Sequence, residues 1–270
     1  MHENIDDVLV VKVGTSTLMK TEEGREGLNH KAFQQIGQQV LRLKEEGQHV
    51  VIFSSGAVSA GMQATGSVDR PNSKTDMPEI QRLASIGWRL VLNAWDNALS
   101  NVATGGILVT RRELDLSVPE RDEVLLTTHS MLNHGDIPIL NENDPIMPTE
   151  LYGKASVQND ILAATFAAQV GRSALFGSRI RLVMLSDVDG FYADARDCST
   201  LIREVTNIHQ YAHYAKDTSS KQGSGGMKTK LEAALIATKN GVDTWIANGQ
   251  EENAVVRALN GEIGTHFICD

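Results

Sequence analysis

Short runs of aliphatic and β-branched residues alternate along the chain with longer stretches whose apolar residues have helical spacing. The run VLVVKVG at 8–14 predicts a buried strand, and the apolar positions between 33 and 43 then mark one face of a helix. A second run, HVVIFSSG at 49–56, follows shortly after that helix. This part of the chain therefore predicts a strand, a helix and a further strand in succession.

The same alternation continues along the rest of the chain. Further strands are expected at 105–110, 136–144, 181–190 and 241–249, and further helices near 79–100, 119–134, 159–171 and 227–240. Parallel strands need long crossover connections, so this order favours an α/β fold, a three-layer α/β/α sandwich around a mostly parallel sheet. The loop-like segments 63–78 and 214–226 do not form linkers, and a single domain over 1–270 is expected.

Composition and charge narrow the classes of function. Of the 270 residues, 41% are hydrophobic and 22% are charged, which is typical of a globular protein rather than a disordered one. The formal net charge of −9 argues against a nucleic-acid or anionic-membrane surface, because both need clustered Lys and Arg. No signal peptide, membrane-spanning run or cysteine framework is visible, since Cys198 and Cys269 stand far apart, and a cytoplasmic location is expected.

Polar residues gather where the predicted strands end, which is where α/β sheets bind ligands. Lys12 lies inside the first apolar strand, two residues before the turn GTST at 14–17. Burial of this lysine is costly unless its ammonium meets a charged partner or ligand, and the turn offers backbone and hydroxyl donors for an anion. A lysine on an edge strand that points to solvent is the alternative.

Two further strand ends carry hydroxyl, amide and acidic side chains. SSGAVSAG at 54–61 gives a strand, hydroxyls, a glycine and a helix, although a simple serine N-cap explains it as well. ILNENDPI at 139–146 places four polar residues, Asn141 to Asp144, together after a strand. These side chains suit a ligand ammonium, and an Asx turn before the proline is an equally good explanation.

The remaining polar turns are consistent with a ligand site or with ordinary helix and turn chemistry. Asn159 and Asp160 start a helix, where capping competes with a role in orienting cations. Ser186 and Asp187 end a strand and are followed by a turn at Gly190, which suits a nucleotide contact or a plain turn. Each of these signals is weak by itself.

The stretch GSGGMKTK at 223–230 has the glycines, helix start and lysines of an anion-binding loop, and a mobile linker has the same composition. The spacing of a Walker loop does not occur in the chain, nor do the G-x-S-x-G and G-x-G-x-x-G motifs. The eight histidines form no metal-binding pattern, so a metal site built from protein side chains is not expected.

Taken in order, the polar turns resemble those of the amino acid kinase family over residues 8–267. The segments that carry the resemblance are VVKVGTSTL, FSSGAVSAG, LNENDPI, QNDILAA, MLSDVDGFY, GSGGMKTKLEAA, GVDTWIANG and GTHF. SSGA together with NEND and the GGM-x-TK loop is typical of the glutamate 5-kinases within that family. The resemblance implies transfer of the γ-phosphoryl group of ATP to the side-chain carboxylate of L-glutamate, the first step of proline synthesis.

The resemblance also implies roles for particular residues. Lys12 would hold the ATP phosphates, Lys230 would stabilise the transferred phosphoryl group, and Asp160 would orient both lysines. The expected glutamate-binding residues are Ser55, Asn141, Asp144 and Asn159. The expected ATP-binding residues are Lys12, Gly14, Ser186, Asp187, Ser224, Gly225, Gly226, Met227, Lys228, Thr229 and Lys230. Mg²⁺ is expected to bridge the phosphates, held mainly by ATP oxygens and water.

Two departures from the family pattern affect these expectations. Gln158 replaces an acidic residue that often precedes the Asn-Asp pair, which changes the expected contact with the substrate α-amino group. The chain ends soon after GTHF, without the C-terminal PUA domain that many bacterial members carry. The resemblance further implies feedback inhibition by proline, with the loop 63–78 as its place, a homo-oligomer, and coupling to the next enzyme of proline synthesis.

Other members of the same family are the nearest alternatives, namely acetylglutamate kinase, aspartokinase, uridylate kinase and isopentenyl phosphate kinase. An acetylated substrate has no ammonium to pair with Asp144, which makes NEND the discriminating feature. A non-catalytic sensor of amino acids or nucleotides on the same fold is the alternative from another class. Such a sensor would be expected to lose a phosphate lysine, whereas this chain keeps Lys12 and Lys230.

Overall fold

The structure is a computed structural model that describes residues 5–22, 25–72, 75–114, 119–146, 159–194, 197–214 and 226–269. The longer strands are β1 (Ile5–Val13), β4 (His49–Ser54), β5 (Thr104–Val109), β6 (Ile137–Glu142), β7 (Phe176–Ser186) and β11 (Asp243–Asn248). The shorter strands are β2 (Met19–Glu22), β3 (Arg25–Leu28), β8 (Phe191–Tyr192), β9 (Leu201–Ile202), β10 (Glu204–Val205) and β12 (Thr265–Phe267). The α-helices are α1 (Thr15–Leu18), α2 (His30–Glu45), α3 (Ala57–Thr65), α4 (Met77–Ala98), α5 (Glu120–Asn133), α6 (Asn159–Arg172), α7 (Met227–Thr238) and α8 (Ala254–Leu259). The 3₁₀ turns are η1 (Asp144–Ile146), η2 (Cys198–Thr200) and η3 (Ile208–Tyr214).

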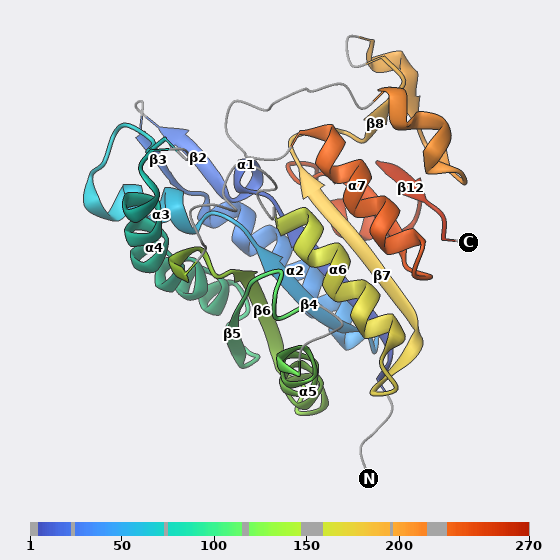
Figure 1. Ribbon diagram of the computed structural model, residues 1–270, viewed down its shortest axis with the longest axis horizontal. Helices are drawn as coiled ribbons and strands as arrows, with labels where there is room; N and C mark the ends of the chain where they lie inside the picture. Colours follow the sequence, from blue (N-terminus) through green and yellow to red (C-terminus); the bar gives the residue numbers. More distant parts are fainter. Residues whose placement is uncertain are drawn as a thin grey trace.

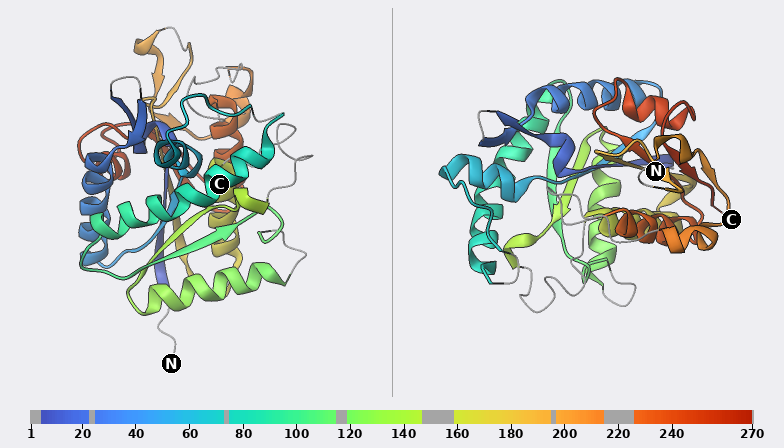
Figure 2. Two further views of the ribbon diagram at one scale, coloured as in Figure 1. Left: turned by 90° about the vertical axis from the view of Figure 1, so that its left-hand side faces the viewer. Right: turned by 90° about the horizontal axis from the view of Figure 1, so that it is seen from above.

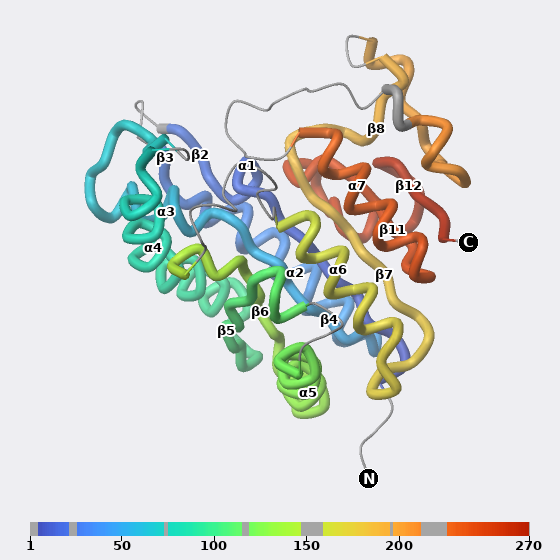
Figure 3. Tube along the Cα trace, viewed as in Figure 1, coloured from blue at the N-terminus to red at the C-terminus, as the bar shows by residue number. Residues whose placement is uncertain are grey.

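Eight of these strands form one sheet in the order β10-β12-β11-β7-β1-β4-β6-β5 (Figure 1). Neighbouring strands in it are parallel, except that β11 and β12 are antiparallel. Figure 3 shows β11 between β7 and β12, in the half of the sheet formed by the C-terminal part of the chain. The α/β fold with a mostly parallel sheet, expected from the alternation of strands and helices, is confirmed.

Helices cover both faces of the sheet, because its central strands are apolar on both sides. Helices α5, α6 and α7 pack on one face, and α2, α4 and α8 pack on the other. In the right-hand view of Figure 2, α2 in blue and α7 in orange-red lie on opposite sides of the strands. Successive residues of β1 alternate accordingly, since Val10 belongs to the core on the α6 side and Val11 to the core on the α2 side.

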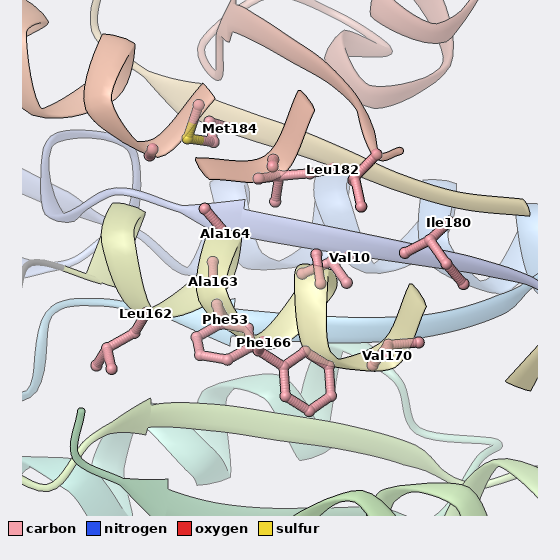
Figure 4. Packing of buried hydrophobic residues seen from close by; sticks show 14 of the residues in the cluster. Val10, Phe53, Leu162, Ala163, Ala164, Phe166, Val170, Ile180, Leu182 and Met184 are labelled. Atoms are coloured by element: carbon pink, nitrogen blue, oxygen red, sulfur yellow. The ribbon is translucent and has the colours of Figure 1, made fainter. Parts of the chain in front are cut away.

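Small and aromatic residues of α6 hold this helix close to the sheet. Figure 4 shows Ala163 and Ala164 on the helix, and the ring of Phe166 beside that of Phe53 from β4. The two ring centroids lie 5.4 Å apart, and both side chains are fully buried, each contributing about 1.5–3 kcal/mol to folding. This packing fixes where α6 begins, which matters because its first two residues are candidate site residues.

The register of the central strands brings the polar turns to one edge of the sheet. Lys12 of β1 is paired with Phe53 of β4 and with Met184 of β7, so these three strands end at nearly the same level. The backbone N–H of Ser55 then donates to the carbonyl of Val13 at 3.0 Å. The turns after these strands therefore meet at the carboxyl edge, which is uppermost in Figure 1.

Helices α3 and α4 cross at close range because glycines face the crossing. A Cβ atom at Gly87 would lie 1.9 Å from the backbone oxygen of Ala57, and one at Gly61 would lie 2.0 Å from that of Leu83. Only glycine therefore fits at these two positions. The crossing fixes α3, which begins directly after the Ser-Ser-Gly turn of the expected site.

Some elements differ from the sequence prediction. The hairpin of β2 and β3 was not predicted, because its sequences MKTE and REGL lack an apolar alternation. Strand β7 begins at Phe176, earlier than expected, and the loop-like segment 63–78 contains the end of α3. None of the described helices is both long and apolar enough to cross a membrane.

Candidate active site

Two lysines and one carboxylate meet at the carboxyl ends of the central strands. Lys12 comes from β1, Lys230 from the first turn of α7, and Asp160 from the first turn of α6. The Nζ of Lys12 lies 2.5 Å from Oδ1 of Asp160, and the Nζ of Lys230 lies 3.2 Å from Oδ2. All three side chains are buried, and β1 is a central strand. Lys12 is therefore not a solvent-facing lysine of an edge strand.

Burial and mutual attraction act in opposite directions on this triad. Burial lowers the pKa of Lys12, and the charge of Asp160 opposes that shift. Burial alone would raise the pKa of Asp160, but the two lysines outweigh it and hold this pKa well below its usual range. Asp160 therefore stays ionised at neutral pH. Two lysines against one carboxylate leave an excess of positive charge that suits an anionic ligand.

The turns beside the triad leave room for ligand atoms. A Cβ atom at Gly14 would lie 3.1 Å from the carbonyl oxygen of Leu185 and 3.6 Å from the Nζ of Lys12. A side chain at this position would therefore occupy the space next to the ammonium. Ser186 ends β7 and is buried, and the exposed Asp187 follows it on the same edge of the sheet.

Helix α7 brings one of its two lysines into the site. The helix begins at Met227 with Gly226 as its N-cap, and its first turn contains Lys228, Thr229 and Lys230. Lys230 is buried and contacts the carboxylate described above, whereas Lys228 is exposed. Three residues named in the sequence analysis lie outside the described residues: Gln158, Ser224 and Gly225.

Asn159 joins two neighbouring strand ends. Its Nδ2 donates to Oγ of Ser55 at 3.1 Å and to Oδ1 of Asn141 at 2.8 Å. Its Oδ1 accepts from the backbone N–H of Glu142 at 3.1 Å. Because Asn159 directly precedes Asp160, the start of α6 connects this amide network to the lysine triad. The structure thus brings together Ser55, Asn141 and Asn159, three of the four residues expected to bind glutamate.

Two carboxyl groups lie at the end of β6, and both resist ionisation. Burial raises the pKa of Glu142 to about 9, and the charge of Asp144 adds to the shift. Burial also raises the pKa of Asp144 to about 6, with Arg70 acting in the opposite direction. Within the described residues, the buried Oε1 of Glu142 has no hydrogen-bond partner. Such a pair is suited to a ligand ammonium, which would supply the missing positive charge.

Two residues in or near this pair were not named individually as site residues from the sequence. Glu142 is an acidic residue at the end of a buried strand, and that signal was available because it is the same one that singled out Lys12. Arg70 belongs to the loop after α3, where neither periodicity nor a motif marks it. Only the folded chain brings its charge close enough to lower the pKa of Asp144.

The described residues do not form a protein metal centre. No group of three or more His, Cys, Asp or Glu side chains among them is placed to hold an ion. The acid nearest the lysines, Asp160, already has one lysine at each carboxylate oxygen.

Taken together, the geometry suits the meeting of two anions. Lys12 and Lys230 approach one carboxylate from the sheet and from α7, so positive charge lies on two sides of the same slot. Paired cations of this kind stabilise the charge that spreads over a phosphoryl group during its transfer. The neighbouring cluster of amide and acid side chains offers partners for an acceptor that carries an ammonium group.

Comparison with known proteins agrees with this class of site. The model of the amino acid kinase family matches residues 7–248, and the chain therefore belongs to the amino acid kinase family. Within that family it is similar to proteins named glutamate 5-kinase. The protein from Thermus thermophilus is 35% identical over 267 residues, and the match covers 96% of this chain and 66% of that protein. The protein from Clostridium acetobutylicum is 35% identical over 269 residues, covering 96% and 94%.

Solved structures show the same fold at low sequence identity. Carbamate kinase from Giardia lamblia, bound to AMP-PNP, superposes with a TM-score of 0.64 at 17% identity and covers 100% of both chains. UMP kinase from Ureaplasma parvum superposes with a TM-score of 0.59 at 14% identity and covers 97% of this chain and 99% of its own. These similarities concern the fold alone.

Proposed function

We propose that the chain transfers the γ-phosphoryl group of ATP to the side-chain carboxylate of L-glutamate and so forms L-glutamyl 5-phosphate. The observation that carries the proposal is the start of α6, where Asn159 joins an amide network and the next residue, Asp160, pairs with two buried lysines. The relatives named glutamate 5-kinase give further support. The chain spans 66% of the length of the Thermus relative and 94% of the Clostridium one, so the proposal concerns the activity of this part.

The lysine triad supplies what this reaction needs most. Two anions, the ATP phosphates and a carboxylate, must be held together, and the transition state spreads negative charge over the transferred group. Lys12 holds the phosphates, Lys230 stabilises the transferred group, and Asp160 holds both lysine side chains in place. No general base is needed because the nucleophile is already a carboxylate.

The pocket at the ends of β4 and β6 binds the amino acid. Asp144 and Asn141 bind the ammonium group. Its positive charge compensates the negative charge at the acid pair of Glu142 and Asp144. Ser55 and its neighbouring backbone bind the carboxylate at the ammonium end of the substrate. Asn159 holds the substrate near the reacting centre. Glu142 is neutral at pH 7, since its pKa is about 9, and it lines the pocket without adding a second negative charge.

ATP occupies the side of the slot between β1, β7 and α7. Gly14 lets the phosphates approach Lys12, and Ser186 and Asp187 contact the nucleotide from the end of β7. The start of α7, from Gly226 to Lys230, covers the phosphates, and Mg²⁺ enters as its complex with ATP. Proline competes with glutamate, because its ammonium and carboxylate suit the same pocket.

A substrate panel tests the proposal. ADP release is measured with glutamate, N-acetylglutamate, aspartate and UMP as acceptors, at fixed MgATP. Turnover with glutamate is expected to exceed turnover with the other three, and millimolar proline is expected to raise the KM for glutamate. Turnover only with UMP or N-acetylglutamate would overturn the assignment, and an unchanged KM in proline would remove the competition.

A further inference from the structure

Arg70 is anchored beside the proposed amino acid pocket by the helix that starts there. Its Nη1 donates to Oγ of Ser59 at 3.0 Å, and Ser59 is a buried residue in the first turn of α3. That helix begins just after Ser55, which belongs to the amide network of the site. The guanidinium is therefore held by a buried residue of the helix that begins two residues after Ser55.

Two carboxylates lie within reach of the charge on Arg70. Oε2 of Glu26, on the β2–β3 hairpin, is 4.0 Å from Nη1, which is a loose ion pair. The second is Asp144, whose pKa the positive charge of Arg70 lowers against the effect of burial. Arg70, held against the first turn of α3, therefore lies close enough to η1 for its charge to act on Asp144, which follows the end of β6.

The guanidinium has donors left for a ligand. An arginine side chain carries five N–H donors, and within the described residues its hydrogen bond to Ser59 uses one of them. The Arg70 side chain is also 49% exposed, so the remaining N–H groups can be reached from solvent. A half-exposed arginine that is fixed at one Nη is suited to a planar carboxylate, which accepts two parallel hydrogen bonds.

An α-amino acid carries an ammonium and a carboxylate on the same carbon, and the pocket presents their counterparts. We propose that Arg70 binds the α-carboxylate of the amino acid substrate and so makes this site specific for α-amino acids. The inference rests on the proposed function and adds a residue that the family motifs do not contain.

The competing explanation is that Arg70 only ties the β2–β3 hairpin to α3. The two explanations predict different effects of an Arg70 substitution on the binding of glutamate and of γ-aminobutyrate. γ-Aminobutyrate keeps the ammonium and the reacting carboxylate of glutamate and lacks the α-carboxylate. Loss of a purely structural contact would lower the affinity of the protein for both compounds alike. Loss of a contact with the α-carboxylate would lower the affinity for glutamate alone.

The test compares the unmodified chain with Arg70→Gln. The glutamate kcat and KM are measured by ADP release, and γ-aminobutyrate is added as a competitor to obtain its inhibition constant. For Arg70→Gln, the glutamate KM is expected to rise about 10- to 100-fold, as for loss of a charged hydrogen bond. The kcat should change less than about twofold, because the contact is remote from the reacting carboxylate. The inhibition constant of γ-aminobutyrate should stay the same.

Two further variants serve as controls. Arg82→Gln removes an arginine that is 48% exposed and pairs with Glu79 on α4, and it should leave both constants unchanged. Arg70→Lys keeps the charge and loses the paired donors, so its glutamate KM should fall between those of the unmodified chain and Arg70→Gln. An equal loss of affinity for glutamate and γ-aminobutyrate, or an unchanged glutamate KM, overturns the role of Arg70. Absence of glutamate turnover in the unmodified chain overturns the proposed function itself.

Discussion

At the scale of single residues, Asp160 explains how two lysines can be buried side by side. An unpaired ammonium in the interior is costly, and two of them repel each other. One oxygen of Asp160 faces each lysine, and the carboxylate is itself buried, so its charge is poorly screened. The arrangement retains an excess positive charge at the point where the proposed reaction needs it.

The two lysines of the first turn of α7 should differ sharply in their importance. Lys230→Ala should lower kcat by about 10³-fold, because it removes one of two cations that stabilise the transferred group. Lys228→Ala is the matched control, since this lysine is exposed and only two residues away, and it should retain near-normal turnover. Circular dichroism checks that both variants fold. Equal losses in the two variants would remove Lys230 from the mechanism.

The pH dependence of glutamate binding should follow the ionisation of Asp144. Its pKa of about 6 is raised by burial, so below pH 6 the empty site holds a neutral acid that cannot pair with the substrate ammonium. Glu142 stays protonated over this range, since its pKa is about 9. The kcat/KM for glutamate should therefore be level above pH 7 and fall about tenfold per pH unit well below pH 6.

The control for this profile is Asp144→Asn. This variant cannot ionise at the position, so its kcat/KM should be low throughout and should lose the inflection near pH 6. Persistence of the inflection in Asp144→Asn would assign the titration to another group. The KM for ATP, measured over the same pH range, should show no matching change.

The sequence alone indicates some of the residues of the candidate site. A lysine in an apolar strand and an Asn-Asp pair at a helix start are unusual enough to stand out, and Lys12, Asn159 and Asp160 were predicted as site residues. Arg70 was not, because nothing in an irregular loop shows which side chain lies close to an acid far away in the sequence. Glu142 was named only as a member of the polar tetrad, although an acid at the end of an apolar strand is a visible signal.

At the scale of elements, the crossing of α3 and α4 positions the amino acid side of the site. The indole N–H of Trp95 on α4 donates to Oγ of Ser54 at 2.8 Å, directly before Ser55. Gly61 and Gly87 allow the two helix backbones to touch. The end of β4 and the start of α3 are therefore held by α4, a helix that contributes no proposed catalytic group.

Adding one methyl group at this crossing should disturb both stability and binding. In Gly87→Ala the new Cβ would lie 1.9 Å from the backbone oxygen of Ala57, so the helices must separate. We expect a loss of about 3 kcal/mol in the free energy of unfolding in urea and a higher glutamate KM.

Gly171→Ala is the matched control for this change. Its Cβ would meet its nearest neighbour, the backbone oxygen of Asn240, at 3.6 Å, which is an ordinary contact. This glycine is in the last turns of α6, where alanine is preferred, so stability should be unchanged or slightly higher. Equal losses in the two variants would show that the close crossing is not the cause.

Elements with a strong apolar pattern were predicted well, and elements without one were not. The helix predicted near 79–100 is α4, and the strand predicted at 105–110 is β5, with shifts of one or two residues. The β2–β3 hairpin has four residues in each strand, and its pairing depends on contacts with other elements, such as that of the Leu28 N–H with Gln63 of α3. Such short strands have no periodicity that a sequence can display.

At the scale of the whole molecule, stability should decrease from the centre of the sheet to its edges. Strands β1, β4 and β7 are flanked by strands on both sides and covered on both faces, whereas β5 and β10 are edges. Amide hydrogen exchange should therefore be slowest in the three central strands and fastest in the two edge strands. Equal protection of β5 and β1 would contradict this ranking.

The sequence by itself determined the order of strands and helices, the fold class and the residue types that gather at strand ends. These features follow from hydrophobic periodicity and local turn chemistry, which act between neighbours in the chain. Only the tertiary structure decided that one carboxylate contacts two lysines, that the charge of Asp144 acts on Glu142, and that the charge of Arg70 acts on Asp144. The reason is physical: burial and charge interaction depend on distances between residues far apart in sequence, and the packing of α3, α6 and α7 on the sheet sets those distances.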